Sequence, residues 1–307
     1  MVAIIMSTYN GENYLPEQLD SLLEQTYNKF VVHVQDDAST DKTWAILTEY
    51  HVRYPDKFRI CQRNSNSGSP KYNFLELMAK VQEDYVMFCD QDDVWLPNKI
   101  AVTLNKVQSM ETDYPDTPIL VYTDLRVVDK DLQLINPSYR HMMNSDFTRN
   151  APNQVLVQAT FAGCSSMYNR KLAELLTTMP DYCVMHDWWV HLVATVFGEV
   201  GYLEETTALY RQHGANQTGV RDMRKIAYKL LWFLKGKEIR EAIQSTYKQA
   251  ESFLKMYENV MSLNSKELVQ NYCEIPRKNK LARWFTVCRL GAYKIGFARN
   301  VAYFLWL

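Results

Sequence analysis

The chain has 307 residues, of which 47% are hydrophobic and 22% are charged. This is the composition of a globular protein with a large core, and the length is sufficient for two domains. No apolar run approaches the roughly 18 residues that a membrane-spanning helix needs, and the first residues lack the pattern of a secretory signal. The six cysteines show no CxxC or other metal-binding spacing, so we expect reduced thiols and a cytoplasmic location.

The net charge of −1 is unevenly distributed along the chain. Residues 221–307 hold 17 Lys and Arg against 7 Asp and Glu, whereas the remaining residues hold 17 basic and 28 acidic side chains. An acidic body is therefore joined to a basic C-terminal region. Such an asymmetry indicates an anionic partner for that region, either a membrane surface or a nucleic acid.

In the first 100 residues, apolar runs alternate four times with helical patterns. The runs predict strands at Val2–Met6, Phe30–Val34, Phe58–Gln62 and Tyr85–Cys89. One helical pattern begins at Pro16, a second covers Trp44–Tyr54, and a third covers Tyr72–Val81. This alternation is typical of an α/β fold with a parallel sheet and right-handed crossovers.

Polar stretches follow these strands, and they are Ser7–Gly11, Asp36–Asp41, Asn64–Lys71 and Asp90–Asp93. The carboxyl ends of parallel strands meet at one edge of a sheet, where ligands bind. We therefore expect the polar stretches to form one site. Neither the GxGxxG fingerprint of dinucleotide-binding proteins nor a P-loop is present.

The stretch Asp90-Gln91-Asp92-Asp93 places three carboxylates within four positions. Carboxylates this close repel one another, and each is costly to remove from water without a partner. A hard cation such as Mg²⁺ or Mn²⁺ takes oxygen ligands and often binds substrate phosphates as well. The stretch is thus either a cation site that holds a diphosphate or a solvated acidic turn before a helix near Pro97.

Beyond Pro97 the sequence predicts further α/β elements and then a helical C-terminal region. The predicted helices are Pro97 to about Glu111, Asn169–Thr177 and Trp188–Phe197, and the predicted strands are Ile119–Asp124, Glu199–Leu203 and Thr207–Tyr210. A basic amphipathic helix is predicted over residues 221–235, stopped by Gly236, and a second helix spans Ile239–Met261. The last segment, Arg277–Leu307, contains seven basic residues and no acidic ones.

Five motifs in order resemble family 2 glycosyltransferases of the GT-A fold, in particular the bacterial rhamnosyltransferase branch that builds cell-wall polysaccharide. They are Met6–Gly11, Asp36–Thr43, Asp90–Trp95, His186–Trp189 and Tyr210–Asn216. The resemblance covers about residues 2–220, and the last three motifs are the ones specific to this branch. Ala38 stands where the family usually has Gly, and a positive φ would be less favourable there.

The resemblance implies a GT-A type α/β fold with a mostly parallel central sheet and a C-terminal helical extension. Residues 1–220 would be the glycosyltransferase domain, with a nucleotide-sugar half at 1–100 and an acceptor half at 101–220. Residues 221–307 would form the basic helical region.

The resemblance also implies roles for individual residues. On the nucleotide, Ser7, Thr8 and Tyr9 would line the base pocket, Asp37 would accept the imide N–H of uracil or thymine, and Asp90 would contact the ribose. Asn66 and Lys71 are further candidates for the nucleotide wall. Asp92 would bind Mn²⁺ or Mg²⁺ on the diphosphate, His213 would lie near that metal, and Arg211 would pair with phosphate.

Asp187 would be the general base that activates the acceptor. It precedes the predicted Trp188 helix, where the helix dipole favours an ionised carboxylate. The alternative is that Asp187 only caps this helix.

The resemblance thus implies an inverting, metal-dependent transfer of L-rhamnose from dTDP-β-L-rhamnose to a lipid-linked cell-wall polysaccharide. A UDP-hexose donor is the alternative within this class. Other classes are a nucleotidyltransferase, which needs a basic triphosphate loop that we do not find, and a non-enzymatic sugar-nucleotide-binding scaffold. We expect peripheral association of the basic helices with the inner face of the cell membrane, or packing in a homodimer, and no nucleic acid because a binding motif is lacking.

Overall fold

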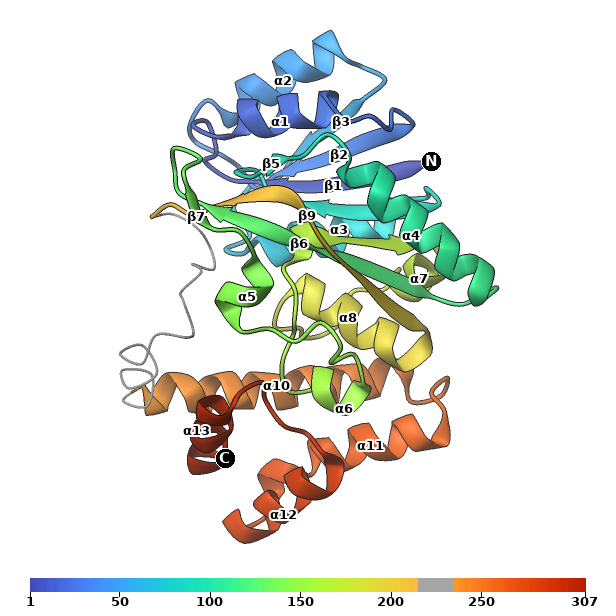
Figure 1. Ribbon diagram of the computed structural model, residues 1–307, viewed down its shortest axis with the longest axis vertical. Coiled ribbons are helices and arrows are strands. Elements are labelled where there is room, and N and C mark those ends of the chain that lie inside the picture. Colours follow the sequence, from blue (N-terminus) through green and yellow to red (C-terminus); the bar gives the residue numbers. More distant parts are fainter. Residues whose placement is uncertain (215–234) are drawn as a thin grey trace. The chain divides into compact units, whose positions relative to one another are not determined.

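The computed structural model describes residues 1–214 and 235–307 (Figure 1). The chain divides into two compact units. The first contains Met1–Tyr139, Ala162–Met179 and Glu199–Gly219, and the second contains Arg140–Phe161, Pro180–Gly198 and Val220–Leu307. Within the described residues, no helix combines the length and the apolar character that crossing a membrane requires.

The first unit is built on one sheet with the strand order β3-β2-β1-β4-β8-β6-β9-β5, and β7 pairs with β6. The strands are β1 (Val2–Thr8), β2 (Phe30–Asp36), β3 (Phe58–Gln62), β4 (Tyr85–Cys89), β5 (Val94–Trp95), β6 (Ile119–Val128), β7 (Leu134–Asn136), β8 (Ser166–Asn169) and β9 (Glu199–Arg211). Strands β3, β2, β1 and β4 are parallel, as predicted. Beyond β4 the sheet is mixed, because β8 runs antiparallel to both β4 and β6 while β9 is parallel to β6.

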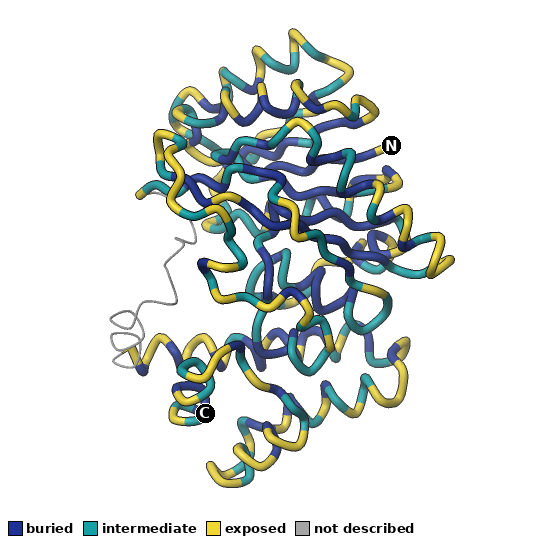
Figure 2. Tube along the Cα trace, in the orientation of Figure 1, coloured by how far each residue is buried: buried dark blue, intermediate teal, exposed yellow. Residues whose placement is uncertain are grey.

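Helices cover this sheet and explain the continuous apolar runs. Every residue of β1 is buried, and its neighbours β2 and β4 are buried at all positions but one each (Figure 2). The helices of this unit are α1 (Leu15–Leu23), α2 (Thr43–Arg53), α3 (Pro70–Lys80), α4 (Lys99–Asp113) and α7 (Arg170–Leu175). A strand buried on both faces needs apolar side chains at successive positions, which the run from Val2 to Met6 supplies.

The register of the parallel strands aligns their carboxyl ends. Thr8 pairs with Asp36, Asp36 pairs with Gln62, and Met6 pairs with Cys89. The polar stretches that follow these strands therefore start at the same edge of the sheet. Ala38, in the stretch after β2, has a φ of 60°, which is the left-handed conformation that glycine adopts more readily.

Most element boundaries differ from the prediction by a few residues, and the differences at α3 and β9 have identifiable reasons. Helix α3 begins at Pro70 rather than Tyr72, because proline is favoured in the first turn, where its missing N–H has no partner to lose. The predicted strands Glu199–Leu203 and Thr207–Tyr210 form the single strand β9. Its register against β6 shifts after Thr123, so an irregularity accommodates the polar residues between the two predicted runs.

The second unit is helical. Its helices include α5 (Tyr139–Met143), which begins at the unit boundary, α6 (Pro152–Val155), α8 (His186–Phe197), α10 (Gly236–Tyr257), α11 (Leu263–Cys273), α12 (Lys280–Leu290) and α13 (Phe297–Trp306). The Trp189 ring of α8 packs on Phe253 and Tyr257 of α10, with ring centroids 5.6 and 6.1 Å apart. The predicted helix Ile239–Met261 is found as α10, which begins three residues earlier and ends four residues earlier than predicted. The basic amphipathic helix predicted over residues 221–235 lies outside the described residues, except for Lys235.

Substitution of Ile4 by Ala should destabilise the first unit, because Ile4 is fully buried in β1 between Val32 and Met87. We expect a loss of about 2–5 kcal/mol in the free energy of unfolding, measured by guanidinium denaturation followed by circular dichroism. The control Val52→Ala removes methyl groups from a side chain that is 73% exposed and should change this value by less than about 0.5 kcal/mol. Equal effects of the two substitutions would contradict the assigned core.

Candidate functional site

The loops after β1 and β4 are joined by the side chain of Gln91. Its carboxamide oxygen accepts from the Tyr9 N–H at 2.9 Å, and its amide nitrogen donates to the Tyr9 carbonyl at 3.0 Å. Gly11 leaves room for this contact, since a Cβ at position 11 would lie 2.4 Å from Gln91 Oε1. Two of the predicted polar stretches are therefore fixed to each other by one residue, which we call the Gln91 clamp.

The loop after β2 is tied to the loop after β1 as well. The Asp37 N–H donates to the Thr8 carbonyl at 2.8 Å, and the Asn10 N–H donates to Ser39 Oγ at 3.0 Å. The register of the strands and these bonds bring three of the four polar stretches together. This part of the predicted site is confirmed as a geometric cluster.

The side chains predicted for the base pocket differ in what they present to solvent. Ser7 Oγ accepts from Asn73 at 3.0 Å, and Thr8 Oγ1 donates to Asp36 at 2.8 Å, so both hydroxyls take part in an internal network. Tyr9, at 45% exposure, presents its ring at the surface. Contact of these residues with a base stays a prediction.

Asp37 is buried and held by the fourth polar stretch. Its carboxylate accepts from the N–H of Ser67 at 3.0 Å and from the Ser67 hydroxyl at 2.9 Å, and Arg63 Nε lies 3.5 Å away. The Asn66 amide donates to the Asp37 carbonyl at 3.2 Å, which brings these two predicted residues together. Lys71, in the first turn of α3, has its ammonium 5.1 Å from the centroid of the Tyr72 ring. The roles of all three toward a nucleotide stay predictions.

Asp92 and His213 meet although 121 positions separate them in the sequence. His213 Nε2 lies 2.7 Å from Asp92 Oδ2, and the imidazole stacks on Tyr14 with ring centroids 4.6 Å apart. This is the pair predicted to hold a metal. Adjacent ligands of an octahedral ion with bonds of about 2.1 Å lie about 3 Å apart, so the two donor atoms need little movement to share one cation.

The Arg211 side chain holds the loop that contains Asp92 by binding the main chain of that loop. Its Nε donates to the Asp92 carbonyl at 2.8 Å, one terminal nitrogen donates to the Lys130 carbonyl at 2.9 Å, and the other pairs with the Glu17 carboxylate. The guanidinium also lies over the Tyr14 ring at 4.8 Å. Arg211 is 3% exposed, so the structure gives this residue a positioning role, and its predicted contact with phosphate stays a prediction.

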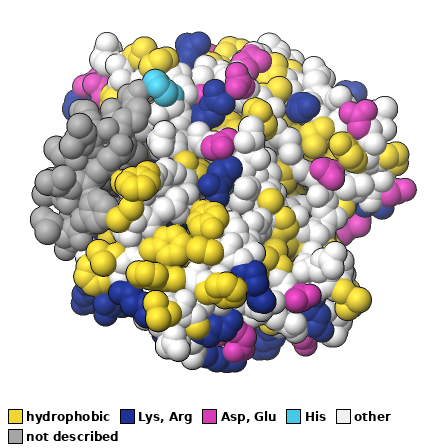
Figure 3. All heavy atoms as spheres, turned by 60° about the horizontal axis from the view of Figure 1, so that its bottom comes forward, with side chains coloured by type: hydrophobic (Ala, Val, Ile, Leu, Met, Phe, Trp, Pro, Cys, Tyr) yellow, Lys and Arg dark blue, Asp and Glu magenta, His cyan; other side chains and the backbone are white. Residues whose placement is uncertain are grey.

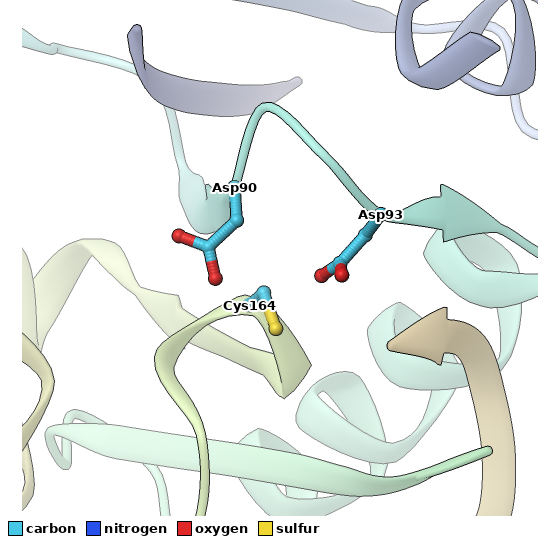
Figure 4. A group of neighbouring side chains, drawn as sticks. All are labelled: Asp90, Asp93 and Cys164. Carbon is cyan, nitrogen blue, oxygen red and sulfur yellow. The ribbon is translucent and has the colours of Figure 1, made fainter. Parts of the chain in front are cut away.

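Asp90, Asp93 and Cys164 point toward one another beneath the loop (Figure 4). One carboxylate oxygen of each aspartate and the Cys164 sulfur lie within 4.8 Å of one another. Asp93 is fully buried, and its Oδ1 accepts from the Arg211 N–H at 3.0 Å. Burial raises the pKa of Asp93 well above its ordinary value, and the neighbouring Asp92 and Asp90 carboxylates raise it further.

A buried lysine partly offsets this acidity. Lys99 is fully buried in α4, and its ammonium donates to Thr207 Oγ1 of β9 at 3.0 Å. Burial lowers the pKa of Lys99, whereas the nearby Cys164 and Asp93 side chains act in the opposite direction. The buried end of the acidic loop therefore has a basic side chain near it.

Asp187 is the predicted site residue that belongs to the second unit. Helix α8 begins at His186, so Met185 occupies the N-cap position and Asp187 lies within the first turn. Its carboxylate accepts from the Trp188 N–H at 2.7 Å. Asp187 is therefore not the N-cap residue, because the helix starts earlier than the hydrophobic pattern suggested, although its carboxylate still binds a first-turn N–H. Its role as general base stays a prediction.

Comparison with known proteins identifies the family. Residues 3–176 match the profile described as Glycosyl transferase family 2. The chain belongs to this family. The dTDP-rhamnosyl transferase RfbG of Shigella flexneri is 27% identical to it over 250 residues, which are 78% of this chain and 82% of the relative.

Solved structures support the GT-A fold of this glycosyltransferase. S. aureus TarS in complex with UDP-GlcNAc aligns with a TM-score of 0.55 at 15% identity, over 99% of this chain and 89% of that chain. The mannosyltransferase PcManGT from Pyrobaculum calidifontis, in complex with GDP-Man and Mn²⁺, aligns with a TM-score of 0.53 at 16% identity, over 99% and 87%. The α/β fold, the GT-A type and the helical C-terminal region are confirmed.

Several residues that shape this site were not predicted from the sequence. Gln91 is an uncharged residue between carboxylates, and no sequence pattern indicates its contact with Tyr9. Tyr14 and Glu17 lie in α1 or just before it, and their contacts with His213 and Arg211 cross most of the chain. Cys164 carried no signal beyond its apolar surroundings.

The Gln91 clamp can be tested by a double-mutant cycle. Gly11→Ala should displace the Gln91 carboxamide, and Gln91→Ala should remove it, so each should lower the free energy of unfolding by about 1–3 kcal/mol. The double variant should lose no more than either single variant, because both act on the same contact. Denaturant unfolding of the four proteins measures this coupling.

Additive losses would show that Gly11 and Gln91 act independently. Gly214→Ala is the matched control, because a Cβ at Gly214 would meet no atom of the described residues within 4 Å apart from its chain neighbours. Its free energy of unfolding should equal that of the parent protein.

Proposed function

We propose that this glycosyltransferase is an inverting, metal-dependent enzyme that transfers L-rhamnose from dTDP-β-L-rhamnose to a lipid-linked cell-wall polysaccharide. The Asp92–His213 pair carries the proposal, since it places two metal-binding groups beside the strand ends where family 2 motifs converge. The choice of rhamnose draws on the relative from Shigella flexneri. A UDP-hexose donor is the alternative. Family membership disfavours nucleotidyl transfer and a non-enzymatic scaffold.

Asp37 would select the base of the donor. A carboxylate has about four acceptor positions, and Ser67 and Arg63 fix its orientation without using all of them. It can therefore accept the imide N–H that thymine and uracil share. Ser7, Thr8 and Tyr9 would line this pocket, Asn66 and Lys71 would complete its wall, and Asp90 would contact the ribose.

Asp92 and His213 would hold the metal against the donor diphosphate. When bound, a divalent cation stabilises the negative charge of the leaving diphosphate. The oxygen and nitrogen donors suit Mn²⁺ better than Mg²⁺, which prefers oxygen. Tyr14 keeps the imidazole in place by stacking, and Arg211 keeps the Asp92 main chain in place. A contact of Arg211 with phosphate would require the guanidinium to exchange one of its present partners.

Asp187 would accept the proton of the attacking acceptor hydroxyl. In an inverting transfer the hydroxyl attacks the sugar from the face opposite the diphosphate, so its proton needs a base on that side. The first turn of α8 stabilises an ionised carboxylate at this position. We assign the nucleotide-sugar site to residues 1–100, the acceptor site to 101–220 and the basic helical region to 221–307.

Asp187→Asn should lower kcat by about 10²–10⁴-fold and leave the KM for the donor nearly unchanged, because it removes only the base. Rhamnose transfer to a synthetic acceptor, followed by chromatography, measures both constants. Asp181→Asn, at an exposed position of the same unit, is the control and should be fully active. Full activity of the Asp187→Asn variant would exclude Asp187 as the base.

Asp92→Asn and His213→Gln should each raise the Mn²⁺ concentration needed for half-maximal transfer by at least tenfold, an effect of about 1.4 kcal/mol on metal binding. The measurement is a panel of nucleotide sugars with Mn²⁺ and with Mg²⁺, scored for hydrolysis and transfer. Asp131→Asn is the control, because this carboxylate is exposed and its ion pair is with the exposed Lys130. Unchanged metal dependence in both variants would rule out this pair as the metal site.

A further inference from the structure

We propose that α12 and α13 form a surface that adsorbs to anionic lipid. This surface, the α12–α13 face, consists of exposed side chains at helical spacing on both helices. Its members are Leu281, Trp284, Phe285 and Cys288 of α12, and Phe297, Val301 and Leu305 of α13. The inference concerns the second unit alone, and it draws on the proposed function only for its purpose, since a lipid-linked acceptor lies at a membrane.

On α12 the exposed residues follow steps of three and four, which place them on one side of the helix. Leu281 is 75% exposed and Phe285 is 71% exposed, and Trp284 and Cys288 are exposed beside them. The opposite side is buried through Thr286 and Val287. Large apolar side chains that gather on one exposed stripe, rather than singly, indicate a binding surface.

On α13 the stripe continues in steps of four residues. Phe297 is 87% exposed, and Val301 and Leu305 follow it along the same side. Ala302 and Tyr303 are buried on the other side. Two consecutive helices of the same segment therefore both present apolar stripes to water.

The two stripes belong to one surface because α12 and α13 contact each other. The Trp284 indole N–H donates to the Phe304 carbonyl at 2.8 Å, and the rings of these residues pack edge to face at 6.1 Å. Lys280 Nζ donates to the Leu305 carbonyl at 3.3 Å, which adds a second link between the helices. Figure 3, which turns the lower end of Figure 1 forward, shows yellow side chains gathered there with dark blue ones beside them.

The charge of the segment favours a lipid surface as the occupant. Residues 277–307 contain seven basic and no acidic side chains. Lys280 and Arg289 are exposed, and the Lys280 ammonium lies 5.7 Å from the centroid of the Trp284 ring. Basic groups beside tryptophan and phenylalanine match the boundary of a bilayer, where the rings enter the headgroup layer and the ammonium groups meet anionic headgroups.

A second copy of the chain fits this face less well. In a two-fold symmetric dimer the same patch meets itself, so these basic groups would face one another without acidic partners in the segment. A lipid surface brings both the apolar medium and the negative charge. A dimer through this face is therefore an outcome of the test rather than part of the proposal.

The two exposed cysteines, Cys288 on α12 and Cys61 on β3, provide a matched pair of probe positions. Cys288 would carry an environment-sensitive fluorophore in a Cys61→Ser protein, and Cys61 would carry it in a Cys288→Ser protein. Vesicles containing about 30% phosphatidylglycerol should shift the emission of the Cys288 probe to the blue and leave the Cys61 probe unchanged. Equal responses of the two probes, or none, would overturn the proposal.

Vesicle sedimentation of the full chain measures the contributions of apolar contact and of charge. Leu281→Ser/Phe285→Ser/Phe297→Ser should lower the partition coefficient by at least about tenfold, because it removes apolar area that would enter the bilayer. Lys280→Gln/Arg289→Gln should lower it by about 25-fold, at roughly fivefold for each charge. The control Val260→Ser/Leu263→Ser changes equally exposed apolar residues outside the face and should bind as the parent does. Circular dichroism confirms that each variant is folded.

Binding to pure phosphatidylcholine as strong as to anionic vesicles would overturn the role of charge. Dimerisation of the parent protein that the triple serine variant abolishes, without vesicle binding, would replace the lipid by a second copy. Rhamnose transfer to a water-miscible acceptor separates this inference from the proposed function. Loss of vesicle binding with transfer intact refutes only the lipid-binding face, whereas vesicle binding without any transfer refutes only the proposed function.

Discussion

The alignment of the carboxyl ends of β1, β2 and β4 is the constraint on which the first unit depends. Parallel pairing in one register sets these three strands to end side by side, so every loop that follows starts at the same edge. Main-chain bonds such as Asp37 N–H to Thr8 then fix the loops to each other. A slip of one residue in β1 would turn its buried side chains to the other face and separate the loops. Core packing and site geometry are therefore specified by the same register.

The acidic loop after β4 is held by Arg211 and lies near a second basic side chain, and both come from elsewhere in the chain. Arg211 at the end of β9 binds its carbonyl, and Lys99 of α4 lies buried on its protein side. Burial of an ionised carboxylate without such partners costs several kcal/mol of folding free energy, unless the carboxylate becomes protonated. The loop thus keeps Asp92 oriented toward His213, whereas Asp93 is buried and accepts a hydrogen bond from the Arg211 main chain. Three neighbouring aspartates have three different environments, although the sequence presents them as one cluster.

Much of this arrangement could be predicted from the sequence, and the part that could not depends on long-range contacts. The strands Phe58–Gln62 and Tyr85–Cys89 were predicted at their observed bounds, because an apolar run between polar residues has clear ends. The division of β9 was predicted wrongly, because a polar interruption in a strand reads as a turn. The pairing of Arg211 with Glu17 joins residues 194 positions apart and leaves no periodic signal. The motifs that follow β1, β2 and β4 and the one at the end of β9 identified residues that gather at one edge of the sheet, but not which atoms each residue uses.

Both hydrogen bonds of the Gln91 clamp are to the main chain of position 9, and neither uses the Tyr9 side chain. The shape of the loop and the identity of the exposed ring are consequently separate properties. Related chains can exchange the aromatic group at this position while the backbone path stays the same, provided that glutamine and the small residue at position 11 are kept. Position 9 is thus a place where evolution, or an engineer, can alter the surface that a ligand meets without rebuilding the scaffold beneath it.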